Sequence, residues 1–123
     1  MVTEDYVSFE TAKLLKEKGF DEPCFRYAES KKIYESGAWM VANVTGGAVG
    51  IPTLQMAMKW LRNTFHLEIY PFHDAIQENN DWWYRIERHF KGCGLTEHES
   101  DVIYKTYEEA CETAIKYCLE NLI

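Results

Sequence analysis

The sequence shows no leader pattern and no apolar run long enough to cross a membrane. Charged residues are spread over the first nineteen positions, whereas a secretory signal has a basic start followed by an apolar core. The uncharged stretch 36–58 is interrupted by polar residues, glycines and a proline, so it is too weakly apolar to form a span. We therefore expect a cytoplasmic protein that does not enter the membrane.

Basic residues are scarce relative to acidic ones. The 123 residues include 13 Lys and Arg against 20 Asp and Glu, which gives a formal net charge of −7. Phosphate recognition needs a cluster of Lys and Arg, and no such cluster occurs in the sequence. We therefore do not expect DNA or RNA as a general partner.

Recognised catalytic and metal-binding patterns are also missing. No Gly-x-Ser-x-Gly elbow places a nucleophile beside a base, and no tight paired spacing joins the histidines and cysteines as zinc ligands. The histidines at 66, 73, 89 and 98 are therefore interpreted as surface residues. We expect neither enzyme activity nor a cofactor or metal.

The four cysteines form no Cys-x-x-Cys pair. Cys111 and Cys118 are seven residues apart in one expected helix, which places their Cα atoms about 10.5 Å apart and prevents a disulfide between them. Cys24 and Cys93 belong to separate segments. We expect four free thiols, most of them buried, as in a protein of a reducing compartment.

Hydrophobic residues make up 46% of the chain, which is enough apolar material for one folded core. Three segments have the apolar spacing of amphipathic helices. The first, 8–18, starts at the expected N-cap Ser8 and stops at Gly19, the second covers 53–65, and the third starts at Thr106 and runs to the C-terminus.

Two pairs of short strands are expected between these helices, at 24–27 with 32–34 and at 67–73 with 81–90. The predicted order is α-β-β-α-β-β-α. We expect a single α+β domain over 1–123, with one mainly antiparallel sheet of about four strands and three helices packed mostly on one face. A flexible glycine-rich connector is expected over 36–52, and its length leaves open whether 38–44 forms a further strand or a flap.

Aromatic residues give the sharpest functional signal. Trp82 and Trp83 are adjacent in an expected strand, so their side chains point to opposite faces of the sheet. With helices on one face, Trp83 points outward, and the same alternation turns Tyr70 and Phe72 outward. The expected inward set of this strand is Trp82, Tyr84, Ile86 and Phe90. An exposed aromatic patch marks a binding surface or a covered one, which leaves three alternatives: the Trp39 segment folds over Trp83, a symmetric dimer forms there, or a ligand or foreign protein binds.

The segment VTGGAVGIPT offers a second candidate site. Glycines there precede a helix, whose free N–H groups and dipole can hold an anion. The residues concerned are Gly46, Gly47, Gly50 and Thr53, with Arg62 or Lys59 as a counter-charge. The segment lacks the spacing of a nucleotide-binding loop, and the competing interpretation is a connector that only caps the helix.

The stretches VSFETAKLLKEKGFDEPC, PTLQMAMKWLR and YEEACETAIKYCLENLI resemble a family of small uncharacterised proteins from prophages and other mobile elements of Bacteroides-type gut bacteria. The resemblance covers the three expected helices, and 24–51 and 66–100 match loosely. It implies a bacterial cytoplasm and a phage-related genome context, and it brings no residue roles with it. We therefore expect a non-catalytic accessory protein that acts through contacts with a protein partner or with itself as a homodimer. The alternative is a small-ligand or anion-binding module.

Overall fold

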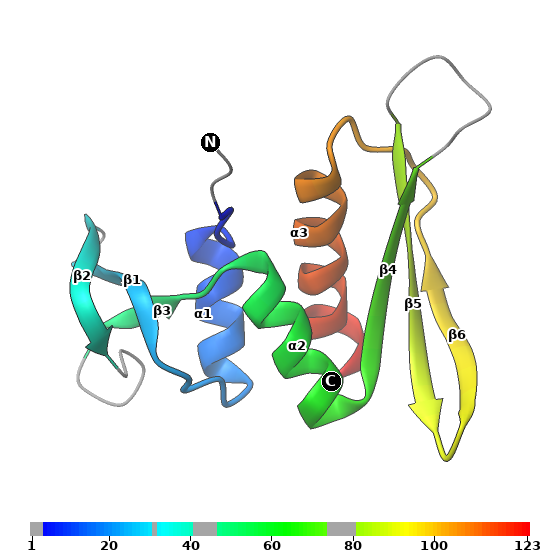
Figure 1. The fold of residues 1–123 in the computed structure, drawn as a ribbon, viewed down its shortest axis with the longest axis horizontal. Helices are drawn as coiled ribbons and strands as arrows, with labels where there is room; N and C mark the ends of the chain where they lie inside the picture. Colours follow the sequence, from blue (N-terminus) through cyan, green and yellow to red (C-terminus); the bar gives the residue numbers. More distant parts are fainter. Residues whose placement is uncertain (1–3, 31, 41–46, 74–80) are drawn as a thin grey trace. The chain divides into compact units, whose positions relative to one another are not determined.

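The structure is a computed structural model that describes residues 4–30, 32–40, 47–73 and 81–123. Its elements, in chain order, are α1 (Phe9–Glu17), β1 (Cys24–Glu29), β2 (Lys32–Met40), β3 (Val49–Ile51), α2 (Leu54–Phe65), β4 (Leu67–His73), β5 (Trp82–Phe90), β6 (Cys93–Glu99), α3 (Tyr107–Tyr117) and the π-helical turn η2 (Cys118–Leu122). The chain divides into two compact units, Met1–Met56 and Ala57–Ile123 (Figure 1). Helices and antiparallel sheets in both units confirm the α+β class.

The first unit joins α1 to a small sheet. Ser8 caps the helix, since its side chain accepts a hydrogen bond from the Thr11 amide at 3.2 Å, as expected. Gly19 ends the helix with a φ of 100°, and the Phe20 amide then donates to the Leu15 carbonyl. The Lys16 ammonium donates to the Ala48 carbonyl at 2.9 Å and ties α1 to the segment before β3.

The sheet of the first unit has the order β2-β1-β3, and both pairings are antiparallel. Tyr27 lies opposite Tyr34 in the register, and their rings stack with centroids 5.3 Å apart. Strand β3 is buried at all three positions and packs against α1. Both ends of the expected connector 36–52 therefore belong to this sheet, while residues 41–46 of it lie outside the described residues.

The second unit contains most of α2 and the sheet β4-β5-β6, again with antiparallel pairing. A two-residue turn joins β5 to β6, and its residues Lys91 and Gly92 have φ values of 41° and 87°. Two positive φ angles in succession are the geometry of a type I′ hairpin turn, which matches the twist of paired strands. The ladder between β5 and β6 shifts register between Ile86 and Glu87, so β6 contains an irregularity at this point.

One face of this sheet is covered by α3, which packs against β4 and β5 (Figure 1). The helix starts at Thr106, whose side chain accepts from the Glu109 amide at 3.1 Å, as expected. Small residues on the helix allow close approach to the sheet. The buried set of this interface is Leu67, Ile69, Tyr84, Ile86, Ala110, Cys111, Ala114, Ile115 and Cys118. Strand alternation turns the other residues of β4 and β5 toward the opposite face of this sheet.

Arg88 ties three parts of the second unit together from the α3 side of β5. Its guanidinium donates to Glu97 Oε1 at 2.9 Å, to the Leu122 carbonyl at 3.0 Å and to the Phe65 carbonyl at 3.4 Å. Two of these acceptors are carbonyls at the C-terminal ends of α2 and η2, which have no partner within their own helix. Arg88 therefore donates hydrogen bonds to C-terminal carbonyl groups of two helices.

The expected single sheet of about four strands is not confirmed, because the described residues form two three-stranded sheets. The added strands are β3 and β6, which the predicted order lacks. Strand β3 has three residues, too few for a periodic pattern, and β6 reads CGLTEHE, a polar and largely exposed sequence without a buried alternation. Three helices on one face are likewise not confirmed, since α3 covers the second sheet and α1 packs against β3. A single domain over 1–123 stays a prediction.

All four cysteines are free, and Cys24, Cys111 and Cys118 are buried while Cys93 is exposed at the start of β6. Burial raises the thiol pKa of Cys24 and Cys111 to about 11 and that of Cys118 to about 12. A thiol reacts as its thiolate, so these three groups are poor nucleophiles at neutral pH.

We expect a disulfide reagent such as Ellman's reagent to modify one thiol per folded chain at pH 8, and all four after unfolding. Raised pKa values and burial protect Cys24, Cys111 and Cys118 in the native state. The variant Cys93→Ser should show no fast-reacting thiol. Two or more fast-reacting thiols in the folded wild type would contradict this assignment.

We expect Arg88→Gln to lower the free energy of unfolding by about 1.5 kcal/mol or more, because three carbonyl and carboxylate acceptors lose their donor. Chemical denaturation measures the change. The control is Lys105→Gln at an exposed site, which should stay within about 0.5 kcal/mol of wild type. Equal stabilities for the two variants would show that Arg88 does not anchor the helix ends.

Candidate functional site

The face of the β4-β5-β6 sheet that points away from α3 carries the candidate site, and we call it the open face. Strand alternation assigns residues to it, because Leu67, Ile69, Tyr84 and Ile86 point into the α3 interface. The open face consists of Glu68, Tyr70 and Phe72 from β4, Trp83, Arg85, Glu87 and His89 from β5, and Gly94, Thr96 and Glu99 from β6. Aromatic and charged side chains therefore share one regular surface.

Aromatic residues occupy one end of the open face. Phe72 lies directly opposite Trp83 in the ladder, and Tyr70 lies opposite Arg85. Phe72 is 45% exposed, while Trp83 and Tyr70 are half-buried. The Arg85 guanidinium carbon is 5.5 Å from the centroid of the Tyr70 ring, which is a cation–π distance. The outward direction predicted for Tyr70, Phe72 and Trp83 agrees with these positions.

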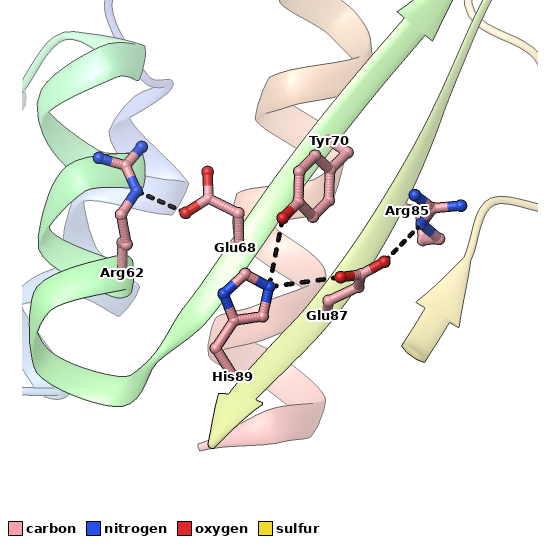
Figure 2. A network of polar contacts seen from close by, with 6 residues as sticks. All are labelled: Arg62, Glu68, Tyr70, Arg85, Glu87 and His89. Carbon is pink, nitrogen blue, oxygen red and sulfur yellow. Dashed lines mark hydrogen bonds and ion pairs between the residues drawn. The ribbon is translucent and has the colours of Figure 1, made fainter. Parts of the chain in front are cut away.

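Two carboxylates face each other next to the aromatic end. Glu68 and Glu87 are direct partners in the register, an arrangement that is destabilising unless the charges are compensated. Arg62, on α2, donates from Nε to Glu68 Oε2 at 2.5 Å. The buried Nε of Arg85 lies 3.0 Å from Glu87 Oε2, within ion-pair distance although not in hydrogen-bond geometry. Each glutamate thus has its own arginine, as Figure 2 shows.

His89 joins these groups from the far end of β5. Its Nε2 lies 3.2 Å from the Tyr70 hydroxyl and 3.3 Å from Glu87 Oε1 (Figure 2). The tautomer of the ring decides whether Nε2 donates to Glu87 Oε1 or accepts from the Tyr70 hydroxyl. Burial raises the pKa of Tyr70, and the carboxylates of Glu87 and Glu68 raise it further. The phenol therefore stays neutral at physiological pH and both donates and accepts hydrogen bonds.

Gly94 provides the space in which this cluster sits. It lies opposite His89 in the ladder, and a Cβ at this position would be 2.8 Å from Glu87 Oε1 and 3.2 Å from His89 Cδ2. Both distances are shorter than ordinary van der Waals contacts. Because Gly94 has no side chain, there is room over this part of β6 for the side chains of Glu87 and His89.

The cluster combines aromatic surface, two guanidinium groups and hydrogen-bonding groups of both kinds. Among the residues that the structure describes, no group of three or more His, Cys, Asp or Glu lies close enough to hold a metal ion. The chemistry that the arrangement supports directly is noncovalent recognition through stacking, hydrogen bonds and charge.

The remaining predicted site residues do not join this cluster. Trp39 lies in β2 of the first unit, and its side chain is outside the described part of the structure, so its expected folding over Trp83 stays untested. Of the anion-site residues, Gly46 is outside the described residues, Gly47 is in an exposed turn and Gly50 is buried in β3. The Thr53 hydroxyl accepts from the Met56 amide at 3.1 Å.

This geometry gives the anion-binding alternative little support. The Leu54 amide already donates to the Asp5 carbonyl, so two N–H groups at the start of α2 have partners within the chain. Arg62 is nine residues from Thr53, or about 13 Å along the helix, and it pairs with Glu68. Lys59 is exposed on α2. Neither Arg62 nor Lys59 is therefore fixed at the N-terminus of α2 as the expected counter-charge.

The sequence analysis turned Trp83 outward and interpreted His89 as a surface residue, but it assigned no role to Arg85 or Glu87. The spacing of Arg85, Glu87 and His89 at every second residue was the available signal. Gly94 and the pairing of Glu68 with Glu87 were missed, because both depend on strand register.

Comparison of the chain with protein-family models, curated proteins and solved structures finds no match. The resemblance of the three helices to a prophage and mobile-element family therefore remains an expectation. Within the described ranges, no helix has both the length and the apolar character needed to cross a membrane.

We expect Gly94→Ala to displace the Glu87 and His89 side chains while the sheet stays folded, because the added methyl group meets the mobile ends of side chains. Two-dimensional NMR spectra should show shifts at Tyr70, Glu87 and His89, with the free energy of unfolding changed by about 1 kcal/mol or less. The control Gly47→Ala adds a methyl group with no heavy atom within 4 Å and should leave these signals unchanged. Unmoved signals in Gly94→Ala would refute the close packing described here.

Proposed function

We propose that the protein is a non-catalytic protein-binding module, an accessory protein of a prophage or mobile element, and that the open face is its contact surface. The observation that carries this proposal is the aromatic pair of Phe72, which is exposed, and Trp83, which is half-buried; the two lie opposite each other on a regular sheet. The genome setting rests on the resemblance of the three helices alone. The contact surface rests on the geometry of the second unit.

The composition of the open face supports this function. Trp, Tyr and Arg are the residues that most often contribute large shares of binding energy in protein interfaces, and Trp83, Tyr70 and Arg85 lie side by side here. Their backbone is part of a three-stranded sheet, so little conformational entropy is lost when a partner binds. A preformed patch of this kind suits recognition better than a mobile loop does.

The strand edges of the same sheet are less suited to binding. Pro71 interrupts β4, one edge strand, with a residue that has no N–H to offer to another strand. The other neighbour of β5 is β6, whose pairing with β5 shifts register between Ile86 and Glu87. Beyond β6, Tyr104 pairs with Trp82 of β5 only through an isolated bridge. Proline and bulges of this kind block the addition of further strands. The face is therefore the better candidate for a partner.

We expect Trp83→Ala and Phe72→Ala to weaken self-association or capture of a partner by about thirtyfold, the loss of a typical interface anchor of about 2 kcal/mol. Native mass spectrometry of the untagged protein reports self-association. Quantitative capture from bacterial cytoplasm, followed by rebinding of the purified captured protein, reports a foreign partner. Circular dichroism melting checks that each variant is folded.

The matched control is Phe25→Ala in the first unit, because Phe25 is 42% exposed and Phe72 is 45% exposed. The control should retain the wild-type assembly and partner. If all three variants bind as the wild type does, the open face is not the contact surface, and the proposal fails.

A further inference from the structure

One ring nitrogen of His89 lies between two groups that require different states of it. Nε2 is 3.2 Å from the Tyr70 hydroxyl and 3.3 Å from Glu87 Oε1 (Figure 2). A carboxylate oxygen only accepts hydrogen bonds, so Nε2 binds Glu87 when it carries a proton. The Tyr70 hydroxyl donates to Nε2 only when that atom has an unprotonated lone pair. The bond donated by Tyr70 and the bond to Glu87 therefore exclude each other.

The local partners favour the Tyr70 bond when the ring is neutral. Burial and the carboxylates of Glu87 and Glu68 raise the pKa of Tyr70, so its phenol has a proton to donate at physiological pH. Among the described residues, Nε2 is the only hydrogen-bond acceptor within reach of that hydroxyl. Glu87, in contrast, already has the Arg85 guanidinium 3.0 Å from its Oε2. A neutral His89 ring is therefore of more use to Tyr70 than to Glu87.

The His89 ring can exchange protons with solvent. Its side chain is 45% exposed, and within the described ranges Nδ1 has no hydrogen-bond partner. Histidine is the side chain whose charge ordinarily changes between pH 5 and 8. A neutral ring with its proton on Nδ1 presents a lone pair to Tyr70, whereas the protonated ring carries a proton on both nitrogens and presents an N–H to Glu87.

Titratable and charged groups surround His89 from each neighbouring element of the second unit. They are Arg62 of α2, His66 before β4, Glu68 and Tyr70 of β4, Arg85 and Glu87 of β5, Lys91 of the β5–β6 turn and Glu99 of β6. Three carboxylates of the open face stand beside the two guanidinium groups of Arg62 and Arg85. Protonation of His89 adds a third positive charge to this set and turns its contact with Glu87 into an ion pair.

We propose that His89 is a proton-operated switch in the open face. In the neutral ring Nε2 accepts a hydrogen bond from the Tyr70 hydroxyl, and in the protonated ring Nε2 donates to Glu87 Oε1. The proton comes from solvent, and the Tyr70 hydroxyl then loses its acceptor and turns to water. The Tyr70 ring stays in place, because the Arg85 guanidinium carbon lies 5.5 Å from its centroid. The switch goes beyond the proposed function, since the isolated chain performs it whether or not the open face binds a partner.

The test follows His89 and Tyr70 by NMR in the full chain labelled with ¹⁵N and ¹³C, between pH 5 and pH 8. We expect the ¹⁵N signal of His89 Nε2 to report a lone pair at the upper end of this range and a bound proton at the lower end. The ¹³Cζ signal of Tyr70 should shift with the same midpoint, because its hydroxyl loses its acceptor as the ring takes up a proton. A neutral ring that carries its proton on Nε2, or a Tyr70 signal that stays constant while His89 titrates, overturns the inference.

Tyr70→Phe removes only the hydroxyl and separates the hydrogen bond from the charge of the ring. In this variant Glu87 is the remaining described partner of Nε2, so the proton of the neutral ring should move from Nδ1 to Nε2. The ¹⁵N signals of the two ring nitrogens measure this exchange. If the neutral ring keeps the same tautomer in Tyr70→Phe as in the wild type, Tyr70 does not hold Nε2 and the inference fails.

His89→Gln should abolish the response of the Tyr70 signal to pH in this range, because an amide does not titrate there. The matched control is His66→Asn, since His66 is exposed, has a φ of 59° that Asn tolerates, and accepts the His89 amide at its backbone carbonyl. The control should keep the response of Tyr70. A response that persists in His89→Gln or disappears in His66→Asn shows that His89 is not the switch. The tautomer measurement uses the wild-type chain and decides the inference even where a variant does not fold.

Discussion

The packing of α3 against β4 and β5 is the constraint on which the second unit depends. Ile86 and Leu67 are fully buried under a helix whose facing positions are the small residues Ala110, Cys111 and Ala114. Once this face is covered, strand alternation leaves every second residue of β4 and β5 on the other side. The position of the aromatic and charged cluster therefore follows from a core interaction that involves none of its members.

Local patterns carried much of the information on the fold. Helix starts at Ser8 and Thr106 and the burial of Leu67, Ile69, Tyr84 and Ile86 were predictable, because each depends on neighbours within a few residues. Phe90 was expected to be inward, yet it is exposed, because it stands at the end of β5 beside the Lys91–Gly92 turn. Strands β3 and β6 were missed, since pairing with distant segments and not their own sequence pattern defines them.

The candidate site shows the same division between local and distant information. The outward directions of Trp83, Tyr70 and Phe72 followed from alternation along single strands. The contact of His89 with Tyr70, the space above Gly94 and the reach of Arg62 to Glu68 join separate elements. A one-residue change of strand register would break the first two of these, and no feature of the individual segments fixes that register in advance.

The opposition of Glu68 and Glu87 across the ladder has an evolutionary consequence. Replacement of Arg62 or Arg85 alone leaves two facing carboxylates without full compensation, whereas replacement of a glutamate alone leaves a guanidinium without its anchor. Substitutions at these four positions are therefore coupled, and each tolerated change favours a second one. In a divergent lineage the four positions should vary as a group, with their balance of charge preserved while the individual residues drift.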